Sequence, residues 1–373
     1  MTEDRPDTAA VEGTVLGGTG GVWRVLADDG VTRESSLRGR LKKSDEGRRA
    51  DGSLRRDTAA AAERRGKLAV GDRVRLEPDE RGAGAWAIAE ILPRRSQLAR
   101  RSPGGAYGER VVVANVDQVV VVFAAARPEP HPRMLDRFLV VAEANGVRAR
   151  VVVNKAELVG DGDAGVGEAR VRERFADYPA AGYPLHVTSV AQRRGLDELR
   201  SALAGRTSAL TGPSGVGKSS LMNALFPGLD LRVGAISDSV NKGRHTTVGA
   251  LLHPLPPAGL GAFGGFVVDT PGLREIGLWG VPADELDHYY PELRPLVDTC
   301  RFADCAHDAE PGCAVRAAVA TGDLSGARLD RWRSLQRETA YQASREDKRL
   351  AAERQAQWKR IHREMRRSGR NRP

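Results

Sequence analysis

The apolar residues of this 373-residue chain change their spacing near residue 110. Before that point they form short runs separated by polar turn residues, which is the pattern of strands in a small β domain. Asp29-Gly30 is a tight-hairpin signal between the second and third runs. Five short strands with basic connecting loops predict an OB barrel, a fold whose strand face and loops commonly bind RNA. The expected strands are 11–16, 22–26, 31–37, 70–76 and 86–92.

From Val111 onward, apolar strands alternate with helical apolar stripes. A buried strand is expected over 119–124, and a helical stripe from Met134 to Ala142 ends at Asn145-Gly146. This rhythm predicts a parallel α/β sheet. Further along, residues 329–365 are expected to form a long helical segment rich in charged residues, and its aromatic residues include Trp332 and Trp358. Some of these aromatics are expected to pack on the neighbouring cysteine-rich loop, and stacking on RNA bases is the alternative.

A phosphate-binding loop is the strongest motif in the second region. The stretch matches the pattern Gly-x4-Gly-Lys-Ser/Thr, follows the apolar Ala209-Leu210 and precedes a helical stripe that ends at Pro227-Gly228. Its glycines allow backbone N–H groups to surround phosphate oxygens, its lysine reaches the β and γ phosphates, and its serine hydroxyl binds Mg²⁺. The predicted phosphate-binding residues are Gly212, Pro213, Ser214, Gly215, Val216, Gly217, Lys218, Ser219 and Ser220.

A second motif, Asp269-Thr270-Pro271-Gly272, ends the apolar run 266–268. There the Asp269 carboxylate is expected in the Mg²⁺ shell and the Gly272 N–H at the γ-phosphate. Between the two motifs lies Gly243-Arg244-His245-Thr246-Thr247, in a stretch of small and polar residues suited to a switch that supplies a threonine to Mg²⁺. Thr246 and Thr247 are both candidates, and the sequence does not choose between them.

A base-reading motif, Asn154-Lys155-Ala156-Glu157, ends the apolar strand 151–153. Its familiar form has Asp where Glu157 stands, and that carboxylate accepts two hydrogen bonds from the guanine edge. Thr188-Ser189-Val190 resembles the small-residue loop that packs beside guanine. In an ordinary GTPase the base-reading motif follows the phosphate loop, whereas here it precedes it. The order predicts a circularly permuted P-loop GTPase domain.

One departure concerns the attacking water. Leu273 follows Gly272, where many GTPases carry the glutamine that orients this water, and leucine cannot do so. His245 is a candidate replacement, because imidazole can orient or deprotonate water near neutral pH. The alternative is a histidine that contacts RNA or solvent, with the water positioned by another group or by a partner. Either way, weak hydrolysis is expected of the isolated protein.

All three cysteines of the chain, with one histidine, gather in Cys300-x4-Cys305-x-His307-x5-Cys313. Three thiolates and one imidazole complete a tetrahedral zinc ion, so the metal is expected to be structural. The odd number of cysteines and the absence of a signal-peptide pattern argue against a disulfide framework. No apolar run is long enough to span a membrane, which predicts a cytoplasmic protein.

The formal net charge of +9 indicates a polyanionic partner. Basic residues gather after Arg38 and again near the C-terminus, in segments that suit phosphate backbones or are simply solvated surface. The chain is expected to comprise several domains. The predicted boundaries are 1–10 (disordered), 11–105 (OB fold, basic insertion 44–66), 106–285 (permuted GTPase), 286–345 (zinc-binding, mainly helical) and 346–373 (basic tail).

This combination of motifs resembles the RsgA family, bacterial GTPases that depend on the small ribosomal subunit. The resemblance covers the chain from about Gly13 to about Arg337. It implies an OB domain, a permuted GTPase domain and a zinc domain, with action late in 30S maturation and hydrolysis stimulated by the subunit. The implied partners are GTP/GDP with Mg²⁺, the 30S subunit and its 16S rRNA, and the protein is expected to be a monomer. Glu157, the basic stretch after Lys43 and the arginine-rich tail depart from the family pattern.

Two other classes of function remain compatible with the sequence. The first is an RNA-binding assembly factor whose nucleotide is a structural clamp without useful turnover, which Leu273 permits. The second is an ATP-using P-loop enzyme, which Glu157 permits and the other GTPase-like motifs disfavour.

Overall fold

The computed structural model describes residues 10–38, 68–79, 84–101, 109–161, 163–229, 231, 250–257, 264–269 and 281–345. Several residues singled out in the sequence lie outside these ranges, namely His245, Thr246, Thr247, Gly272 and Leu273, together with the insertion 44–66 and the tail 346–373. The chain divides into two compact units. The first comprises Met1–Arg100 and Glu109–Gly277, and the second comprises Arg101–Gly108 and Leu278–Pro373.

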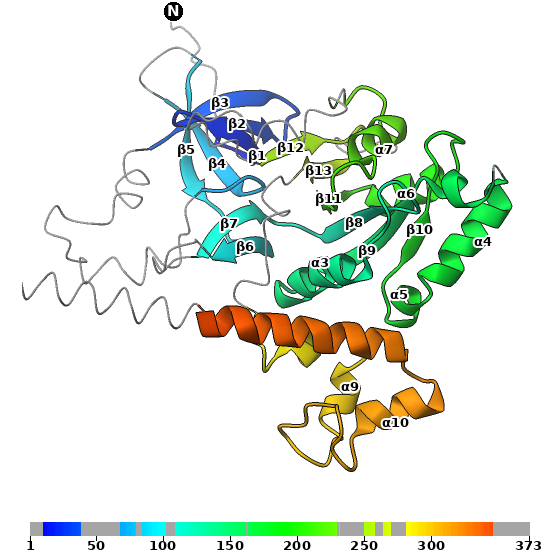
Figure 1. Cartoon of the computed structure of the whole chain (residues 1–373). Coiled ribbons are helices and arrows are strands. Elements are labelled where there is room, and N and C mark those ends of the chain that lie inside the picture. The colour runs from blue at the N-terminus through cyan, green and yellow to red at the C-terminus, as the bar shows by residue number, and fades with distance from the viewer. Residues whose placement is uncertain are drawn as a thin grey trace, which may run out of the picture. The chain divides into compact units, whose positions relative to one another are not determined.

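The N-terminal strands close into a barrel in the order β1-β2-β3-β5-β4, which confirms the OB-like barrel (Figure 1). Its centre is filled by side chains that alternate inward along the strands, such as Val15, Val25 and Leu76. β4 begins three residues later than predicted, because Gly71 has a φ of +86° and turns the chain before the strand starts. The strands are β1 (Val11–Thr19), β2 (Val22–Ala27), β3 (Thr32–Leu37), β4 (Arg73–Pro78) and β5 (Trp86–Ile91).

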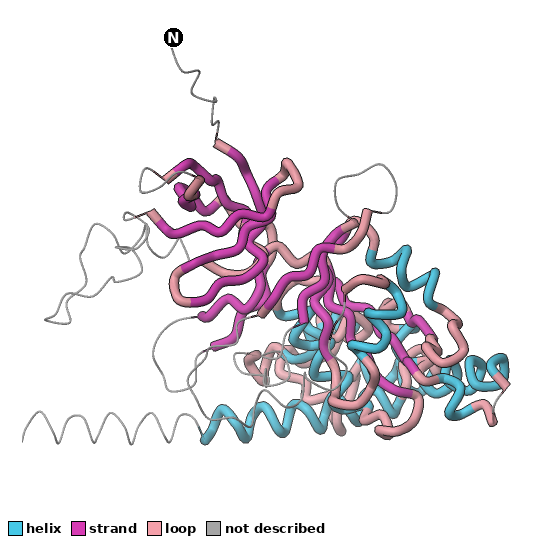
Figure 2. Tube along the Cα trace, turned by 90° about the horizontal axis from the view of Figure 1, so that it is seen from above, coloured by secondary structure: helices cyan, strands magenta, loops and turns pink. Residues whose placement is uncertain are grey.

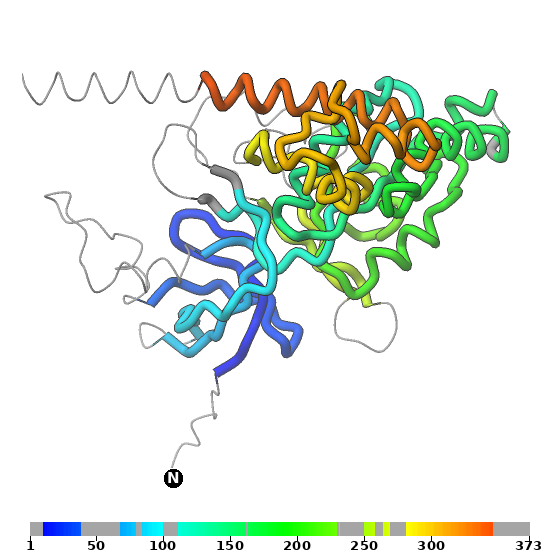
Figure 3. The backbone as a smooth tube through the Cα atoms, turned by 90° about the horizontal axis from the view of Figure 1, so that it is seen from below, coloured from blue at the N-terminus to red at the C-terminus, as the bar shows by residue number. Residues whose placement is uncertain are grey.

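Beyond the barrel, β6 (Gln97–Arg101) and β7 (Glu109–Ala114) pair as a two-stranded sheet that the sequence pattern did not predict. Figure 3 shows this segment leading from the barrel into the second sheet. A polar joint connects it to the barrel. The buried Asp72 carboxylate accepts hydrogen bonds from Arg94 Nε at 2.7 Å and Nη2 at 2.8 Å, and Asn115 Nδ2 donates to the Gly71 carbonyl at 2.9 Å.

The central sheet has six strands in the order β10-β9-β8-β11-β13-β12. Every pairing is parallel except that of β12 with β13, so the expected parallel α/β sheet is confirmed, with an antiparallel edge strand that was not predicted. The strands are β8 (Gln118–Ala124), β9 (Arg148–Asn154), β10 (Leu185–Val187), β11 (Arg206–Thr211), β12 (Leu251–Pro254) and β13 (Gly265–Asp269).

Helices cover both faces of this sheet (Figures 1 and 2). Along β8, Val119, Val121 and Phe123 point toward α3 (Pro132–Ala144) in one core, where α4 (Ala164–Arg174) and α5 (Asp177–Ala180) also contribute. Val120 and Val122 point into a second core with α6 (Leu196–Leu203) and α7 (Lys218–Leu225). Since β8 is buried on both faces, its sequence is continuously apolar and not alternating. Met134, placed in the predicted stripe of α3, is 38% exposed in its first turn.

The second unit is mainly helical, as predicted for the C-terminal part of the fold. It contains η3 (Leu286–Tyr289), α9 (Arg294–Val297), α10 (Ala314–Thr321) and a helix over residues 326–345. Trp332, on this last helix, is 1% exposed, whereas Tyr341 is 63% exposed. Across the described parts of both units, no helix has the length and apolar character required to cross a membrane.

Candidate functional site

The sequence-predicted nucleotide motifs lie at one edge of the central sheet. Asn154 ends β9, Gly212 follows β11 and Asp269 ends β13, and these three strands are parallel. The carboxyl ends of parallel strands meet at one edge of a sheet, which is where open α/β sheets bind ligands. The sheet therefore brings together motifs that are far apart in the sequence.

Glycine is required at two points of the phosphate loop. Gly212 has a φ of +136°, and a Cβ there would lie 2.0 Å from the Val122 carbonyl oxygen. Gly217 has a φ of +90°, and a Cβ there would lie 2.8 Å from Asn154 Nδ2. Gly217 also precedes the first residue of α7. The loop thus ends at a helix N-terminus, whose free N–H groups favour phosphate.

Lys218 and Ser219 begin α7 and are 7% and 8% exposed. The Lys218 ammonium donates to the carbonyls of Gly212 at 2.9 Å and Pro213 at 2.7 Å, so the cation is held within the loop. The Ser219 hydroxyl stands in the first turn of the helix, as a Mg²⁺ ligand in such a loop must. These positions suit the roles that the sequence predicts for both residues.

The base-reading motif contacts the phosphate loop directly. Asn154 Nδ2 donates to the Val216 carbonyl at 3.1 Å, and Lys155 Nζ donates to the carbonyls of Gly215 and Arg127, each at 2.7 Å. Lys155 adopts a left-handed conformation, with a φ of +62°. The contribution of Arg127 was not predicted, because it is made by a main-chain carbonyl that any residue type offers.

Glu157 and Thr188 complete this side of the site. The Ala156 N–H donates to the Thr188 carbonyl at 3.2 Å, and Thr188 Oγ1 donates to Asn154 Oδ1 at 3.2 Å. Thr188 thus lies beside the motif, where the sequence resemblance to a guanine-packing loop predicts it. Glu157, in η1 (Ala156–Val159), buries its Oε2 atom with no hydrogen-bond partner among the described residues. This oxygen can accept a hydrogen bond from an N–H donor of a ligand.

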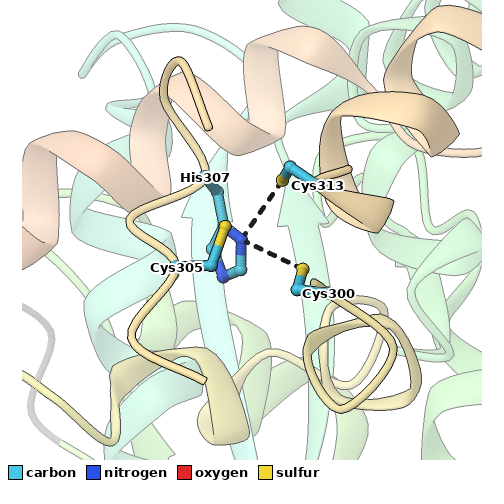
Figure 4. Close-up of side chains that lie close together, drawn as sticks. All are labelled: Cys300, Cys305, His307 and Cys313. Atoms are coloured by element: carbon cyan, nitrogen blue, oxygen red, sulfur yellow. Dashed lines mark hydrogen bonds between the residues drawn. The ribbon is translucent and has the colours of Figure 1, made fainter. Parts of the chain in front are cut away.

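The four predicted metal ligands come together in the second unit. One ligand atom from each of Cys300, Cys305, His307 and Cys313 lies within 4.8 Å of the others. His307 Nδ1 is 3.7 Å from Cys300 Sγ and 3.5 Å from Cys313 Sγ, and Figure 4 shows the imidazole between the thiols. Zn–S bonds of about 2.3 Å and Zn–N bonds of about 2.0 Å put tetrahedral ligand atoms about 3.5–3.8 Å apart. The residues therefore fit a four-coordinate zinc ion.

The thiols differ in their electrostatic surroundings. Burial raises the pKa of Cys305 to about 12, with a smaller contribution from the neighbouring Cys313. Burial also acts to raise the pKa of Cys313, but hydrogen bonds from the Arg316 N–H and from His307 outweigh it, so this pKa is lowered. Cys313 is the N-cap of α10, which explains the hydrogen bond from Arg316 at 3.4 Å. The helix N-terminus thus favours the thiolate form of Cys313, whereas Cys305 requires a nearby cation to ionise.

Local contacts shape the loop that carries the cluster. The exposed Glu310 carboxylate accepts hydrogen bonds from the N–H groups of Ala306, Asp308 and Ala309 at 2.9–3.1 Å. The His307 ring lies 5.2 Å from the Trp332 ring between centroids, so one of the predicted aromatics does pack on this loop. The role of Glu310 was not predicted, because a carboxylate that folds back on its own loop has no distinctive sequence pattern.

Comparison with known proteins agrees with this geometry. The family model of the RsgA GTPase matches residues 91–279. The "Small ribosomal subunit biogenesis GTPase RsgA" of Gemmatimonas aurantiaca is 57% identical over 331 residues, covering 89% of this chain and 98% of the relative. The protein of the same name from Azotobacter vinelandii is 42% identical over 268 residues, covering 72% and 74%.

Two solved structures share the fold. The crystal structure of YjeQ from Thermotoga maritima has a TM-score of 0.64 at 31% identity and covers 89% of this chain and 99% of its own. YloQ, described as a circularly permuted GTPase, has a TM-score of 0.63 at 25% identity and covers 91% and 98%. The fold and its nucleotide motifs thus define a circularly permuted GTPase, a GTP-hydrolysing enzyme. Within that class, the chain belongs to the RsgA family.

Proposed function

We propose that this GTPase binds the small (30S) ribosomal subunit and acts late in its maturation, with GTP hydrolysis stimulated by the subunit and driving release. The observation that carries the GTPase part is the docking of Asn154 and Lys155 on the phosphate loop, beside the buried Glu157 Oε2. The names of the relatives from Gemmatimonas and Azotobacter support the subunit as partner.

In this proposal Glu157 reads guanine, Lys218 binds the β and γ phosphates, and Ser219 and Asp269 hold Mg²⁺. The Gly272 N–H meets the γ-phosphate, and Thr246 or Thr247 completes the Mg²⁺ shell. When bound, Mg²⁺ neutralises charge that develops on the phosphate oxygens. His245 orients the attacking water once the subunit orders the switch. Zinc at Cys300, Cys305, His307 and Cys313 is structural, because four protein ligands leave no open coordination position.

The barrel and the basic character of the chain support 16S rRNA as the contact within the subunit. OB barrels commonly bind nucleic acid on their strand face, and a net charge of +9 favours a polyanion. We further propose that the protein is a cytoplasmic monomer that binds GTP or GDP. The domain boundaries given above remain a prediction.

The test is phosphate release from GTP by the full chain, alone and with purified 30S subunits. Lys218→Ala serves as the blank, because it removes the cation from the phosphate loop. Arg133→Ala, which removes an exposed cation on α3, serves as the matched control for a charge change with the fold retained. ATP replaces GTP in a parallel series.

Subunit-stimulated release that disappears in Lys218→Ala and persists in Arg133→Ala is the expected result. Tight 30S binding without any stimulation contradicts the proposal and favours a structural clamp. Equal turnover of ATP and GTP contradicts the guanine-reading role of Glu157. Under stimulated conditions, His245→Ala should lose most of the turnover, and normal turnover would remove His245 from the catalytic role.

A further inference from the structure

The second nitrogen of the candidate metal ligand His307 has no hydrogen-bond partner within the described residues. His307 is 1% exposed, and its Nδ1 faces the thiols of Cys300 and Cys313. Its Nε2 points away from them and is buried. When Nδ1 binds a cation, the proton of the neutral imidazole resides on Nε2. A buried N–H donor without an acceptor costs free energy, so this atom requires a partner.

One charged group stands opposite that nitrogen. Asp287 Oδ2 lies 3.8 Å from His307 Nε2, and the Asp287 side chain is 19% exposed. The other carboxylate oxygen, Oδ1, accepts the His288 N–H at 2.9 Å, which fixes the carboxylate. Asp287 belongs to η3, which is anchored by the fully buried Leu286. The carboxylate is therefore held by its own backbone, and its free oxygen faces the imidazole.

Two other described neighbours of His307, Trp332 and Arg333, do not offer this ring an acceptor. The Trp332 ring packs against the imidazole at an interplanar angle of 54°, and the only polar atom of its side chain, Nε1, is a donor. Arg333 donates to the main-chain carbonyl of His307, so it binds the backbone and not the ring. Within the part of the chain that the structure describes, Asp287 is the acidic group that faces Nε2.

We propose that Asp287 is the positioning residue of the metal site, accepting a hydrogen bond from His307 Nε2–H and thereby fixing the tautomer and ring orientation of this ligand. The inference rests on the proposed zinc site. A direct hydrogen bond requires about 2.7–3.2 Å, so the two atoms must approach by about 0.6–1.1 Å from their separation of 3.8 Å. Metal-bound histidines commonly donate their second N–H to a carboxylate, and loss of such a partner weakens metal binding about 10–100-fold.

The test compares zinc release from the purified, zinc-loaded full chain to a chromophoric chelator. Asp287→Ala removes the acceptor, and Asp287→Asn keeps an acceptor oxygen without the charge. Asp284→Ala is the matched control, since Asp284 is an exposed acid in the same segment. The second readout is the His307 Nε2–H resonance in ¹⁵N-histidine-labelled protein, which a purely structural role of Asp287 would not move.

Asp287→Ala should release zinc about 10–100-fold faster than wild type, with its Nε2–H resonance lost to exchange with water. Asp287→Asn should release zinc at a rate between those of wild type and Asp287→Ala. Asp284→Ala should release zinc at the wild-type rate. The proposal is wrong if Asp287→Ala releases zinc at the wild-type rate and its His307 Nε2–H resonance is unchanged. If Asp287→Ala does not fold, wild-type behaviour of Asp287→Asn in both readouts overturns it.

The zinc content of the protein distinguishes failure of this inference from failure of the proposed zinc site on which it rests. If wild-type protein prepared without chelator contains no zinc, the proposed metal site is wrong, and so is the role of Asp287. A different result is zinc that is present in wild type, lost in Cys300→Ser and released by Asp287→Ala at the wild-type rate. In that case the metal site is supported and only the positioning role is wrong.

Discussion

At the scale of single residues, the candidate nucleotide site depends on main-chain atoms as much as on side chains. Lys155 and Asn154 donate to carbonyls of the phosphate loop, and the left-handed Gly217 leaves no room for a Cβ beside Asn154. Glu157 differs in that its buried Oε2 has no hydrogen-bond partner among the described residues. This carboxylate is the residue on which base selection should depend.

Glu157→Gln is expected to lower the affinity for GTP by about 10–100-fold, since a hydrogen bond to a charged acceptor contributes roughly 1.5–3 kcal/mol. The glutamine amide offers a donor, so the variant should gain affinity for XTP, whose base carries a carbonyl where guanine has an amine. Competition with a fluorescent GDP measures both changes. Glu157→Asp is the control that retains the charge. An unchanged ratio of GTP to XTP affinity in Glu157→Gln would exclude the base-reading role.

At the scale of elements, polar contacts determine how neighbouring segments meet. The Asp72 carboxylate is completely buried and joins the start of β4 to the segment that leaves β5, because Arg94 donates two hydrogen bonds to it and the Ala69 N–H donates a third at 2.8 Å. By contrast, the ion pair of Arg172 with Glu168 on α4 is exposed to solvent. The two pairs should differ strongly in their contribution to stability.

Asp72→Ala is expected to reduce the free energy of unfolding of the first unit by about 3–5 kcal/mol, because it leaves a partly buried guanidinium without its carboxylate. Glu168→Ala, the matched change at an exposed pair, should cost no more than about 0.5 kcal/mol. Urea denaturation at constant pH measures both. Similar midpoints for the two variants would contradict a structural role for the buried joint.

The loop 300–313, which we propose binds zinc, is a second element, and its conformation is expected to depend on the metal. Removal of the metal by a strong chelator should leave the three thiols and His307 without their common partner, so that the loop 300–313 loses its fixed conformation. Trp332 packs on the His307 ring, and its fluorescence should shift toward that of a solvated indole. Nucleotide binding by the first unit should persist, and added Zn²⁺ should restore the emission. Unchanged circular dichroism and fluorescence after complete metal removal would contradict a structural metal.

At the scale of the whole molecule, the net charge favours a polyanionic partner. The chain has 58 Lys and Arg residues against 49 Asp and Glu residues. Ion pairs such as Asp28 with Arg73 each use one charge of either sign, so they leave the net charge of +9 unchanged. This net positive charge should attract an RNA surface without specifying its sequence.

Binding to the 30S subunit is expected to weaken as salt rises, with a linear relation between the logarithms of affinity and salt concentration. A small number of phosphate contacts already predicts a loss of at least about tenfold between 50 and 200 mM salt. Sedimentation with subunits in the presence of a non-hydrolysable GTP analogue measures this, and GTP binding by the free protein at each salt concentration is the control. Salt-independent subunit binding would exclude a mainly electrostatic rRNA contact.

Much of the fold and of the site could be predicted from the sequence, where each feature is encoded in contiguous residues. The strand 118–124, the phosphate loop and the Cys–His cluster each follow from local spacing and local chemistry. The order of the motifs also predicted the permutation. The short strands β6 and β12 were missed because their segments carry no long apolar run. β7 does contain the apolar run 111–114, but its pairing with β6 has no local signal in the sequence.

Contacts between distant segments were decided only by the tertiary structure. Lys155 meets the carbonyls of Arg127 and Gly215, and Asp287 faces His307, because the topology places these segments together. Sequence spacing does not predict such pairs, because the role of a carbonyl or a carboxylate depends on which group it contacts in the folded protein. The sequence thus determined which chemical groups this protein has, because residue type and local backbone preference are properties of short segments. Tertiary packing determined which of those groups act together, because that depends on the register and order of strands far apart in the chain.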